Sequence, residues 1–174
     1  MKKSLLLSAI ALFSVIIVGC AGHQYNVKTV KYVQQTPTNE NETRVFVFRI
    51  SNFTGSGNRF AIINNDTIVG TVGSGEFMSF IAKGNKNLVA AIIPTAHEDS
   101  AQGYFYFEGQ KKKEMYLQFK LAMGEDLGMK EISKEEAHIL MNKYDYQEFL
   151  EFPKPKWRAN LLKYYERLQQ QTAN

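Results

Sequence analysis

Short apolar segments alternate with turn-forming residues between residues 44 and 121, and this pattern constrains the fold more than any other feature. The segments are rich in β-branched and aromatic residues, which is typical of β-strands. Turn signals recur about every 8–12 residues, as they do in antiparallel β-sandwiches, and no helix-length stretch intervenes, which argues against a parallel α/β sheet. The seven predicted strands are 44–51, 59–64, 67–72, 76–82, 86–94, 103–109 and 114–121. We therefore expect a mainly β fold, an antiparallel β-sandwich of about seven strands.

One or two C-terminal helices are predicted to follow. Ser133 and Glu136 form a capping-box pattern, and the helix that they open should extend to about Tyr144. A second helix should begin near Pro155, a favourable first helical residue, and run to about Gln170. Its apolar residues recur at helical spacing and are Trp157, Leu161, Tyr164, Tyr165 and Leu168.

The N-terminus is organised like a secretory signal peptide. Lys2 and Lys3 are positively charged, and an uncharged, largely apolar stretch of 14 residues runs from Leu5 to Val18. As a helix, this stretch would be about 21 Å long, which is shorter than the ~30 Å hydrocarbon core of a membrane. We therefore predict a cleaved signal peptide over residues 1–19 rather than a membrane span.

Cys20 is the only cysteine of the chain, and Ile17, Val18 and Gly19 precede it. These four residues resemble the lipobox of bacterial lipoproteins. The resemblance implies lipidation of the Cys20 thiol, cleavage after Gly19 and, usually, N-acylation of the new terminus; two or three acyl chains anchor far better than one. A cysteine that merely packs in an apolar helix is the alternative. In Gram-negative lipoproteins an aspartate after the cysteine favours the inner membrane, so Ala21 implies the outer membrane, facing the periplasm.

Residues 21–43 are mostly polar and end in a run of Thr, Asn, Glu and Pro, a composition that suits a flexible tether. Tyr25, Val27 and Thr29 alternate with polar residues, which is also the pattern of a short edge strand. The predicted domains are a signal peptide (1–19), a lipidated cysteine with its tether (20–43), a β-sandwich (44–132) and a C-terminal helical segment (133–174).

An ordered series of motifs is similar to a family of bacterial envelope lipoproteins that carry a small domain of unknown function. Arg49 takes the place of the family's arginine, Ile63-Asn64-Asn65 of its dyad turn, and Val69-Gly70 of its hydrophobic–glycine pair. Lys83-Gly84-Asn85-Lys86 replaces the family's Pro-Gly-Lys-His, and Lys113-Glu114-Met115-Tyr116 replaces its final motif. The family's proline, histidine and paired tyrosines are missing.

This resemblance covers residues 44–144. It implies a transthyretin-like or related small β-sandwich with a trailing helix, and it assigns no catalytic residues. For Arg49, a solvated or ion-paired strand arginine is the alternative to a functional role.

The sequence offers little catalytic or metal-binding chemistry. None of the three histidines, His23, His97 and His138, has HxH or HxxxH spacing, which a zinc site would favour. His97-Glu98-Asp99 is a local cluster that loop polarity explains as well as a cation or acid–base site. Gly73-Ser74-Gly75 lacks the frame of a serine nucleophile and is predicted to be a hairpin turn. We therefore expect a protein that is not an enzyme and holds no metal or cofactor.

The charge of the chain is modest. Its formal net charge is +4, and loss of Lys2 and Lys3 with the leader leaves 19 basic against 17 acidic residues, or +2. That is too little to indicate a nucleic-acid partner. The single cysteine also excludes an intrachain disulfide.

The C-terminal segment concentrates basic residues around Trp157. They are Lys154, Lys156, Arg158, Lys163 and Arg167, with Glu166 as the only acid after residue 153. Two interpretations stay open. The helix either lies on an anionic membrane surface or in a partner groove, or it docks its aromatic face on the sandwich and leaves its basic face in solvent.

Together these features predict a lipid-anchored cell-envelope protein whose β domain is a structural or protein-interaction module on the periplasmic face of the membrane. Another envelope protein or the cell wall would be its partner. The alternative is a binder of a small apolar ligand, held within the sandwich or under the C-terminal helix. The aromatic residues that motivate this alternative are Phe46, Phe48, Phe105, Phe107 and Trp157.

Overall fold

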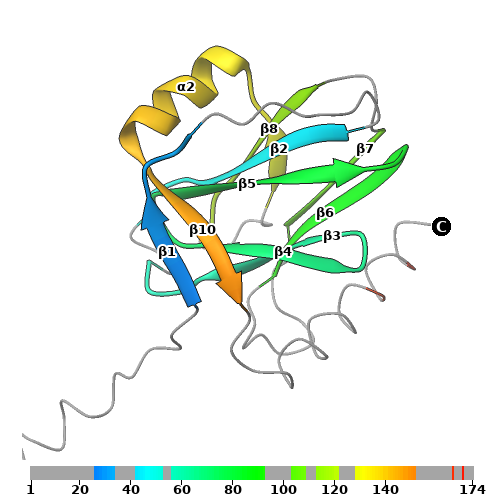
Figure 1. The fold of residues 1–174 in the computed structure, drawn as a ribbon, viewed down its shortest axis with the longest axis horizontal. Helices are drawn as coiled ribbons and strands as arrows, with labels where there is room; N and C mark the ends of the chain where they lie inside the picture. The colour runs from blue at the N-terminus through cyan, green and yellow to red at the C-terminus, as the bar shows by residue number, and fades with distance from the viewer. Residues whose placement is uncertain are drawn as a thin grey trace, which may run out of the picture.

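The computed structural model describes residues 26–33, 42–52, 56–92, 103–108, 113–121 and 128–151, together with Glu166 and Gln170. These described residues contain ten strands and one helix with defined ends, so the fold is mainly β, as predicted. The elements in Figure 1 are β1 (Asn26–Val30), β2 (Glu42–Arg49), β3 (Phe60–Asn64), β4 (Thr67–Val72), β5 (Glu76–Lys83), β6 (Lys86–Ile92), β7 (Gly103–Glu108), β8 (Glu114–Phe119), β9 (Met129–Glu131), α2 (Lys134–Lys143) and β10 (Asp145–Glu151).

The strands form two sheets. The six-stranded sheet has the order β1-β10-β5-β2-β8-β9, and the four-stranded sheet has the order β4-β3-β6-β7. Alternate side chains of each strand point to opposite faces, and the inner faces of the two sheets share one apolar core, to which Val45, Leu117, Ile62 and Val89 contribute. The sheets also meet at both edges, where β4 contacts β5 and β10, and β7 contacts β9.

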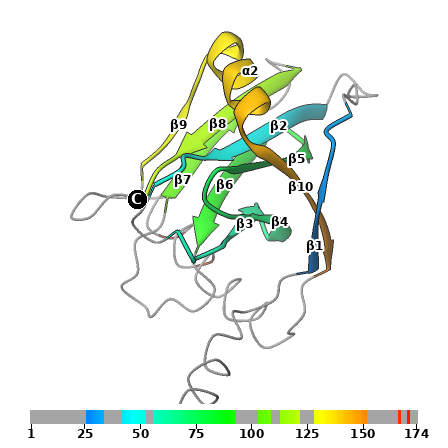
Figure 2. The ribbon, with the colours of Figure 1, turned by 90° about the vertical axis from the view of Figure 1, so that its left-hand side faces the viewer.

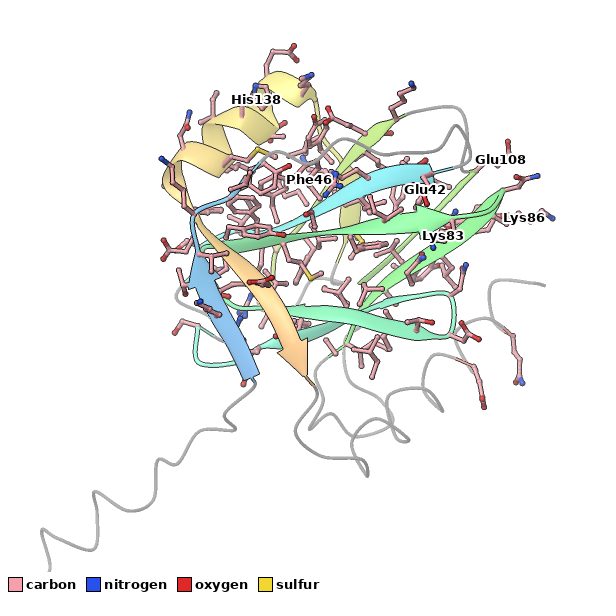
Figure 3. All side chains as sticks on the ribbon, viewed as in Figure 1. Glu42, Phe46, Lys83, Lys86, Glu108 and His138 are labelled. Atoms are coloured by element: carbon pink, nitrogen blue, oxygen red, sulfur yellow. The ribbon has the colours of Figure 1, made fainter. Side chains whose placement is uncertain are left out.

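All seven strands predicted from the sequence are present, as β2 to β8. The predicted turn at Asn64-Asn65 joins the paired strands β3 and β4. Gly73-Ser74-Gly75 is a turn as well, but the prediction of a hairpin was wrong there, because β4 and β5 belong to different sheets. Asn65, in the turn between β3 and β4, has φ 53°, and Gly75, between β4 and β5, has φ 72°; asparagine and glycine are the residues that adopt this left-handed region most readily. Opposite charges face each other across the strands at the β5–β6 end of the molecule, where Lys83 pairs in register with Glu42 and Lys86 with Glu108 (Figure 3).

The sheet topology corrects two predictions. The expected count of seven strands was too low, because β1, β9 and β10 bring the described strands to ten. The expectation of a purely antiparallel arrangement was also wrong, because β2 pairs with β8, and β5 with β10, in parallel. Which strands become neighbours depends on contacts between distant segments, and local alternation carries no information about them.

Two of the three additional strands, β1 and β10, lie in segments whose main predicted structure was not a strand. β1 lies within the predicted tether, where the short edge strand was the other interpretation, and it pairs with β10. β10 lies within the predicted helical segment 133–174, between the ends of its two predicted helices, and no strand was predicted there. Its extended conformation is stabilised by pairing with β1 on one side and β5 on the other.

Helix α2 begins where the capping box predicts. The side chain of Ser133 accepts a hydrogen bond from the backbone amide of Glu136 at 3.1 Å, and the helix ends at Lys143. Its apolar residues pack on the outer face of the six-stranded sheet, the side that faces away from β3 and β4 (Figures 1 and 2). Within the described residues, no helix has both the length and the apolarity needed to cross a bilayer. Of the second predicted helix the structure describes Glu166 and Gln170, which are both helical.

A charged cluster around Glu76 joins the two sheets at the start of β5. Arg59, next to β3, donates two hydrogen bonds to the carboxylate of Glu76, at 2.9 and 2.6 Å, and the amide of Gly73 donates a third at 2.8 Å. Arg49 lies beside them with 1% of its surface exposed, and its guanidinium stands 4.8 Å from the centre of the Phe60 ring. Burial lowers the pKa of Arg49, and the negative charge of Glu76 counteracts that shift. Arg49 is therefore buried rather than solvated.

Candidate functional site

A cavity of about 450 Å³ opens between α2 and the outer face of the six-stranded sheet. We call it the α2 pocket. Three parts of the chain line it: the two residues that follow β1, the adjacent strands β2 and β8, and one face of α2. The lining residues are Lys31, Tyr32, Phe46, Glu114, Tyr116, His138, Met141 and Asn142. Figure 3 shows His138 on α2 and Phe46 below the helix.

The floor of the pocket is aromatic because of the register between two parallel strands. Phe46 of β2 lies opposite Tyr116 of β8, and their rings stack with centroids 5.2 Å apart and an interplanar angle of 16°. Tyr32 meets Phe46 edge-on at 5.6 Å. Such stacked and edge-to-face contacts are favourable arrangements of aromatic rings. They make the floor a surface of packed aromatic rings.

A hydrogen-bonded pair of side chains lies at one side of this floor. Glu114 and Tyr116 are two residues apart on β8 and therefore share a face of the sheet. The Tyr116 hydroxyl donates to Oε2 of Glu114 at 2.6 Å, and Nζ of Lys134 lies 3.5 Å from the same oxygen. Burial, followed by the hydrogen bond and negative charge of Glu114, raises the pKa of Tyr116 well above its usual value. Tyr116 is therefore a neutral hydroxyl throughout the physiological pH range.

The rim of the pocket is polar and open to solvent. Lys31, His138 and Asn142 are exposed, whereas Phe46 and Tyr116 are 2% and 6% exposed. The cavity thus combines an apolar floor with hydrogen-bonding groups at its mouth. Its volume falls within the range of roughly 300–1,000 Å³ that is usual for small-molecule sites.

The residues singled out for lipidation lie outside the described residues, namely Ile17, Val18, Gly19 and Cys20. The proposed membrane or partner contacts also lie outside them, namely Lys154, Lys156, Trp157, Arg158, Lys163 and Arg167. The same holds for the cluster His97-Glu98-Asp99. Their predicted roles stay predictions.

The aromatic residues expected to hold an apolar ligand separate into three environments. Phe46 lines the α2 pocket. Phe48 lies on the same outer face but stacks on Phe77, with centroids 5.2 Å apart. Phe105 and Phe107 belong to the core between the sheets. Of these described aromatics, Phe46 is therefore the one that lines the α2 pocket.

Sequence reasoning missed most of the pocket. The alternation of β8 correctly separates Tyr116 and Gln118 from the core residues Met115 and Leu117. That pattern identifies Tyr116 as a residue of the outer face, but it does not show that Phe46 and Tyr32 are its neighbours. The contacts join the residues after β1 with β2, β8 and α2, and Phe46 and Tyr116 are 70 residues apart in the sequence, so only the folded chain shows them.

The charged cluster around Glu76 lies apart from the α2 pocket and has a structural role. Each oxygen of its carboxylate already accepts hydrogen bonds from Arg59 or Gly73, so little capacity is left for a ligand. Over the ranges that the structure describes, no group of three or more His, Cys, Asp or Glu side chains is placed to hold a metal ion.

A scan of protein-family models and searches of curated proteins and solved structures found no significant match to this chain.

Proposed function

We propose that this chain is a lipid-anchored cell-envelope protein that binds a small amphipathic ligand in the α2 pocket. The observation that carries the proposal is the pocket itself, with stacked Phe46 and Tyr116 rings on its floor and exposed polar side chains at its mouth. An apolar lining with a few polar groups is the usual form of a small-molecule site. The sequence suggested a ligand within the sandwich or under the C-terminal helix, whereas the pocket supports a position under α2.

The lining groups define the chemistry of the ligand. A flat apolar moiety would stack on the aromatic floor, as rings do on Phe and Tyr. Its polar end would be an acceptor or an anion, because the Lys31 ammonium can only donate hydrogen bonds and Asn142 offers two further donors. Glu114 already accepts a hydrogen bond from Tyr116 and lies 3.5 Å from Lys134, so its negative charge repels an anionic ligand only weakly.

The proposal is for binding and not for catalysis. The Tyr116 hydroxyl stays protonated and donates a short hydrogen bond to Glu114. A general base must be free to accept a proton near neutral pH, and the Tyr116 hydroxyl, which keeps its own proton, does not meet that requirement. The pair is suited instead to hold the floor of the pocket in a fixed geometry.

Native mass spectrometry of the protein purified from its own host tests the proposal. The wild-type chain should carry a small molecule of defined mass. Asn142→Trp, which fills the mouth of the pocket, should lose it, whereas Ile139→Trp, on a side chain of α2 that is 67% exposed, should retain it. A protein without a bound molecule, or equal occupancy in both variants, would contradict the proposal.

The lipid anchor rests on the match of Ile17-Val18-Gly19-Cys20 to a lipobox, and Ala21 supports an outer-membrane position facing the periplasm. The transthyretin-like or related sandwich fold belongs to the same proposal, and the two facing sheets support it. Radiolabelled palmitate should enter the wild-type protein and be absent from Cys20→Ser. An unlabelled wild-type protein would overturn the anchor.

A structural or protein-interaction module is the second candidate function, and the edge strand β7 favours it. Tyr104 and Tyr106 are 47% and 54% exposed on this strand, and tyrosine is enriched where proteins bind each other. A photoreactive amino acid at position 106 should capture an envelope protein or cell-wall fragment in intact cells. The same group at position 139, which is also exposed, is the control, and equal capture at both positions would count against this interface.

A further inference from the structure

The rings on the floor of the α2 pocket form a row with two distinct ends. The ring centroid of Phe46 lies 5.6 Å from that of Tyr32 and 5.2 Å from that of Tyr116. Tyr32 also contacts the rings of Phe77 on β5 and Tyr146 on β10. Because β5 adjoins β2 on one side and β8 adjoins it on the other, Tyr32 and Tyr116 lie on opposite sides of Phe46.

The end of the row beside Tyr32 offers a hydrogen-bond donor. Lys31 is the chain neighbour of Tyr32 and lines the pocket with it. An ammonium group carries a positive charge and can only donate hydrogen bonds. This end therefore fits the anion of the proposed ligand.

The opposite end of the row, where Glu114 and Tyr116 line the pocket, offers acceptors. The Tyr116 hydroxyl has a single hydrogen, and its bond to Oε2 of Glu114 uses that hydrogen. The raised pKa of Tyr116 keeps the hydrogen in place, so the hydroxyl oxygen has only lone pairs left for a ligand. The direction of this one hydrogen bond thus makes Tyr116 an acceptor toward the cavity.

The Glu114 carboxylate adds a second acceptor. The bond from Tyr116 and the contact with Lys134 both involve Oε2, so Oε1 takes part in neither. An ionised carboxylate only accepts hydrogen bonds, through about four lone-pair positions on its two oxygens. A ligand that displaces water from these acceptors without offering a donor leaves them unpaired, which costs free energy.

The neighbouring charge favours a neutral donor over a cationic one. Nζ of Lys134 lies 3.5 Å from Oε2 of Glu114, so it offsets the negative charge of the carboxylate and repels a second ammonium group. A hydroxyl group donates a hydrogen bond without this repulsion.

We propose that the ligand of the α2 pocket carries a neutral hydrogen-bond donor, such as a hydroxyl group, at the end of its flat ring system opposite to its anion, and that Glu114 and Tyr116 select for this donor. The inference rests on the proposed function, because it adds a second polar group to the ligand described there. The pair on β8 consequently determines ligand specificity as well as the geometry of the floor.

Three naphthalene-2-sulfonates that differ only at ring position 6 test the proposal. Each is flat and has an anion at one end, whereas the far end carries a hydrogen atom, a hydroxyl group or a methoxy group. Isothermal titration calorimetry of the full chain near neutral pH, where the naphthol hydroxyl keeps its proton, measures the three affinities. The hydroxyl compound should bind about tenfold more tightly than the unsubstituted one, as expected for a hydrogen bond to a charged acceptor. The methoxy compound should show no such gain.

The three compounds separate failure of the inference from failure of the proposed function. A gain that is absent for the hydroxyl compound, or that the methoxy compound shares, would overturn the inference, while binding of the unsubstituted compound would still support the pocket as a ligand site. Binding of none of the three would overturn both.

A variant of Glu114 identifies the acceptor. Glu114→Gln keeps the shape of the side chain but removes its charge, so it should reduce the preference for the hydroxyl compound several-fold. Its affinity for the unsubstituted compound should be retained, which shows that the pocket is intact. Glu148→Gln, which removes an exposed carboxylate of β10, is the matched control and should keep the full preference.

A full preference for the hydroxyl compound in Glu114→Gln would place its hydroxyl group at another acceptor and refute the role of Glu114. The comparison of the three compounds in the wild-type protein stays decisive if Glu114→Gln fails to fold.

Discussion

The two sheets differ in what lies on their outer faces. The outer face of the six-stranded sheet presents rings and hydroxyls, such as Phe46, Tyr116 and Tyr146, and α2 covers it only in part. The outer face of the four-stranded sheet presents buried alanine, isoleucine and leucine side chains on β3 and β6, and it ends in the half-exposed Tyr104 and Tyr106 on edge strand β7. An aromatic face with polar atoms can border a water-filled cavity at low cost, whereas a purely aliphatic face loses about 25 cal/mol for each Å² that it leaves in water. The first face is thus suited to an exchangeable ligand, and the aliphatic part of the second to permanent burial.

The largest expected effect comes from the aliphatic face. Ile63→Ala should lower the free energy of unfolding by about 2–5 kcal/mol, because it removes buried methyl groups and leaves a cavity. Urea unfolding measures the change. Ile139→Ala, on a largely exposed side chain of α2, should stay within about 0.5 kcal/mol of wild type. Equal losses in the two variants would contradict the burial of Ile63.

The N-terminal cap of α2, the helix that forms one wall of the pocket, is expected to contribute less to stability than Ile63. Ser133→Ala removes the acceptor of the Glu136 amide and should cost about 1 kcal/mol. The loss should appear as faster hydrogen exchange in α2 than in β3 or β6. Ser56→Ala, in an exposed turn, serves as the control. If exchange in α2 were unaffected, the cap would not hold the wall of the pocket.

The burial of Tyr116 and its hydrogen bond to Glu114 should make the stability of the fold depend on alkaline pH. The raised pKa of Tyr116 means that the folded protein keeps this proton while an unfolded tyrosine loses it near pH 10. Stability from this group is therefore complete below about pH 10 and decreases as the pH rises further. Tyr116→Phe should reduce that decrease in urea unfolding above pH 10, and Tyr106→Phe, on an exposed tyrosine, should not. Parallel pH profiles for wild type and Tyr116→Phe would contradict this assignment.

The smallest effect on the free energy of unfolding is expected at Lys134, beside the rim of the α2 pocket. Lys134 lies 3.5 Å from Glu114, but its side chain is 56% exposed, and such surface ion pairs contribute roughly 0–1 kcal/mol. Lys134→Met should therefore change the free energy of unfolding by less than about 1 kcal/mol, and the change should vanish in high salt. A loss as large as that of Ile63→Ala would show that the rim supports the fold.

Local patterns in the sequence predict the mainly β fold well, and they do so for physical reasons. Alternation on β8 separates Tyr116 from Leu117, and Ser133 marks the start of α2, because both features depend on neighbours within a few residues. The parallel pairing of β2 with β8, and the strand character of β10, depend on contacts over long stretches of chain. The stacking of Phe46 on Tyr116 depends on that pairing, so the pocket could not be predicted either.

The contrast between the two faces depends most on the claim that the α2 pocket admits a ligand. Titration with 1-anilinonaphthalene-8-sulfonate, a flat aromatic anion with the chemistry proposed for the ligand, tests this claim directly. The wild-type protein should bind the probe saturably at one site. Asn142→Trp should weaken the affinity at least about tenfold, or 1.4 kcal/mol, and Ile139→Trp should leave it unchanged. Equal binding by the wild type and Asn142→Trp would show that the probe binds elsewhere and would contradict the account.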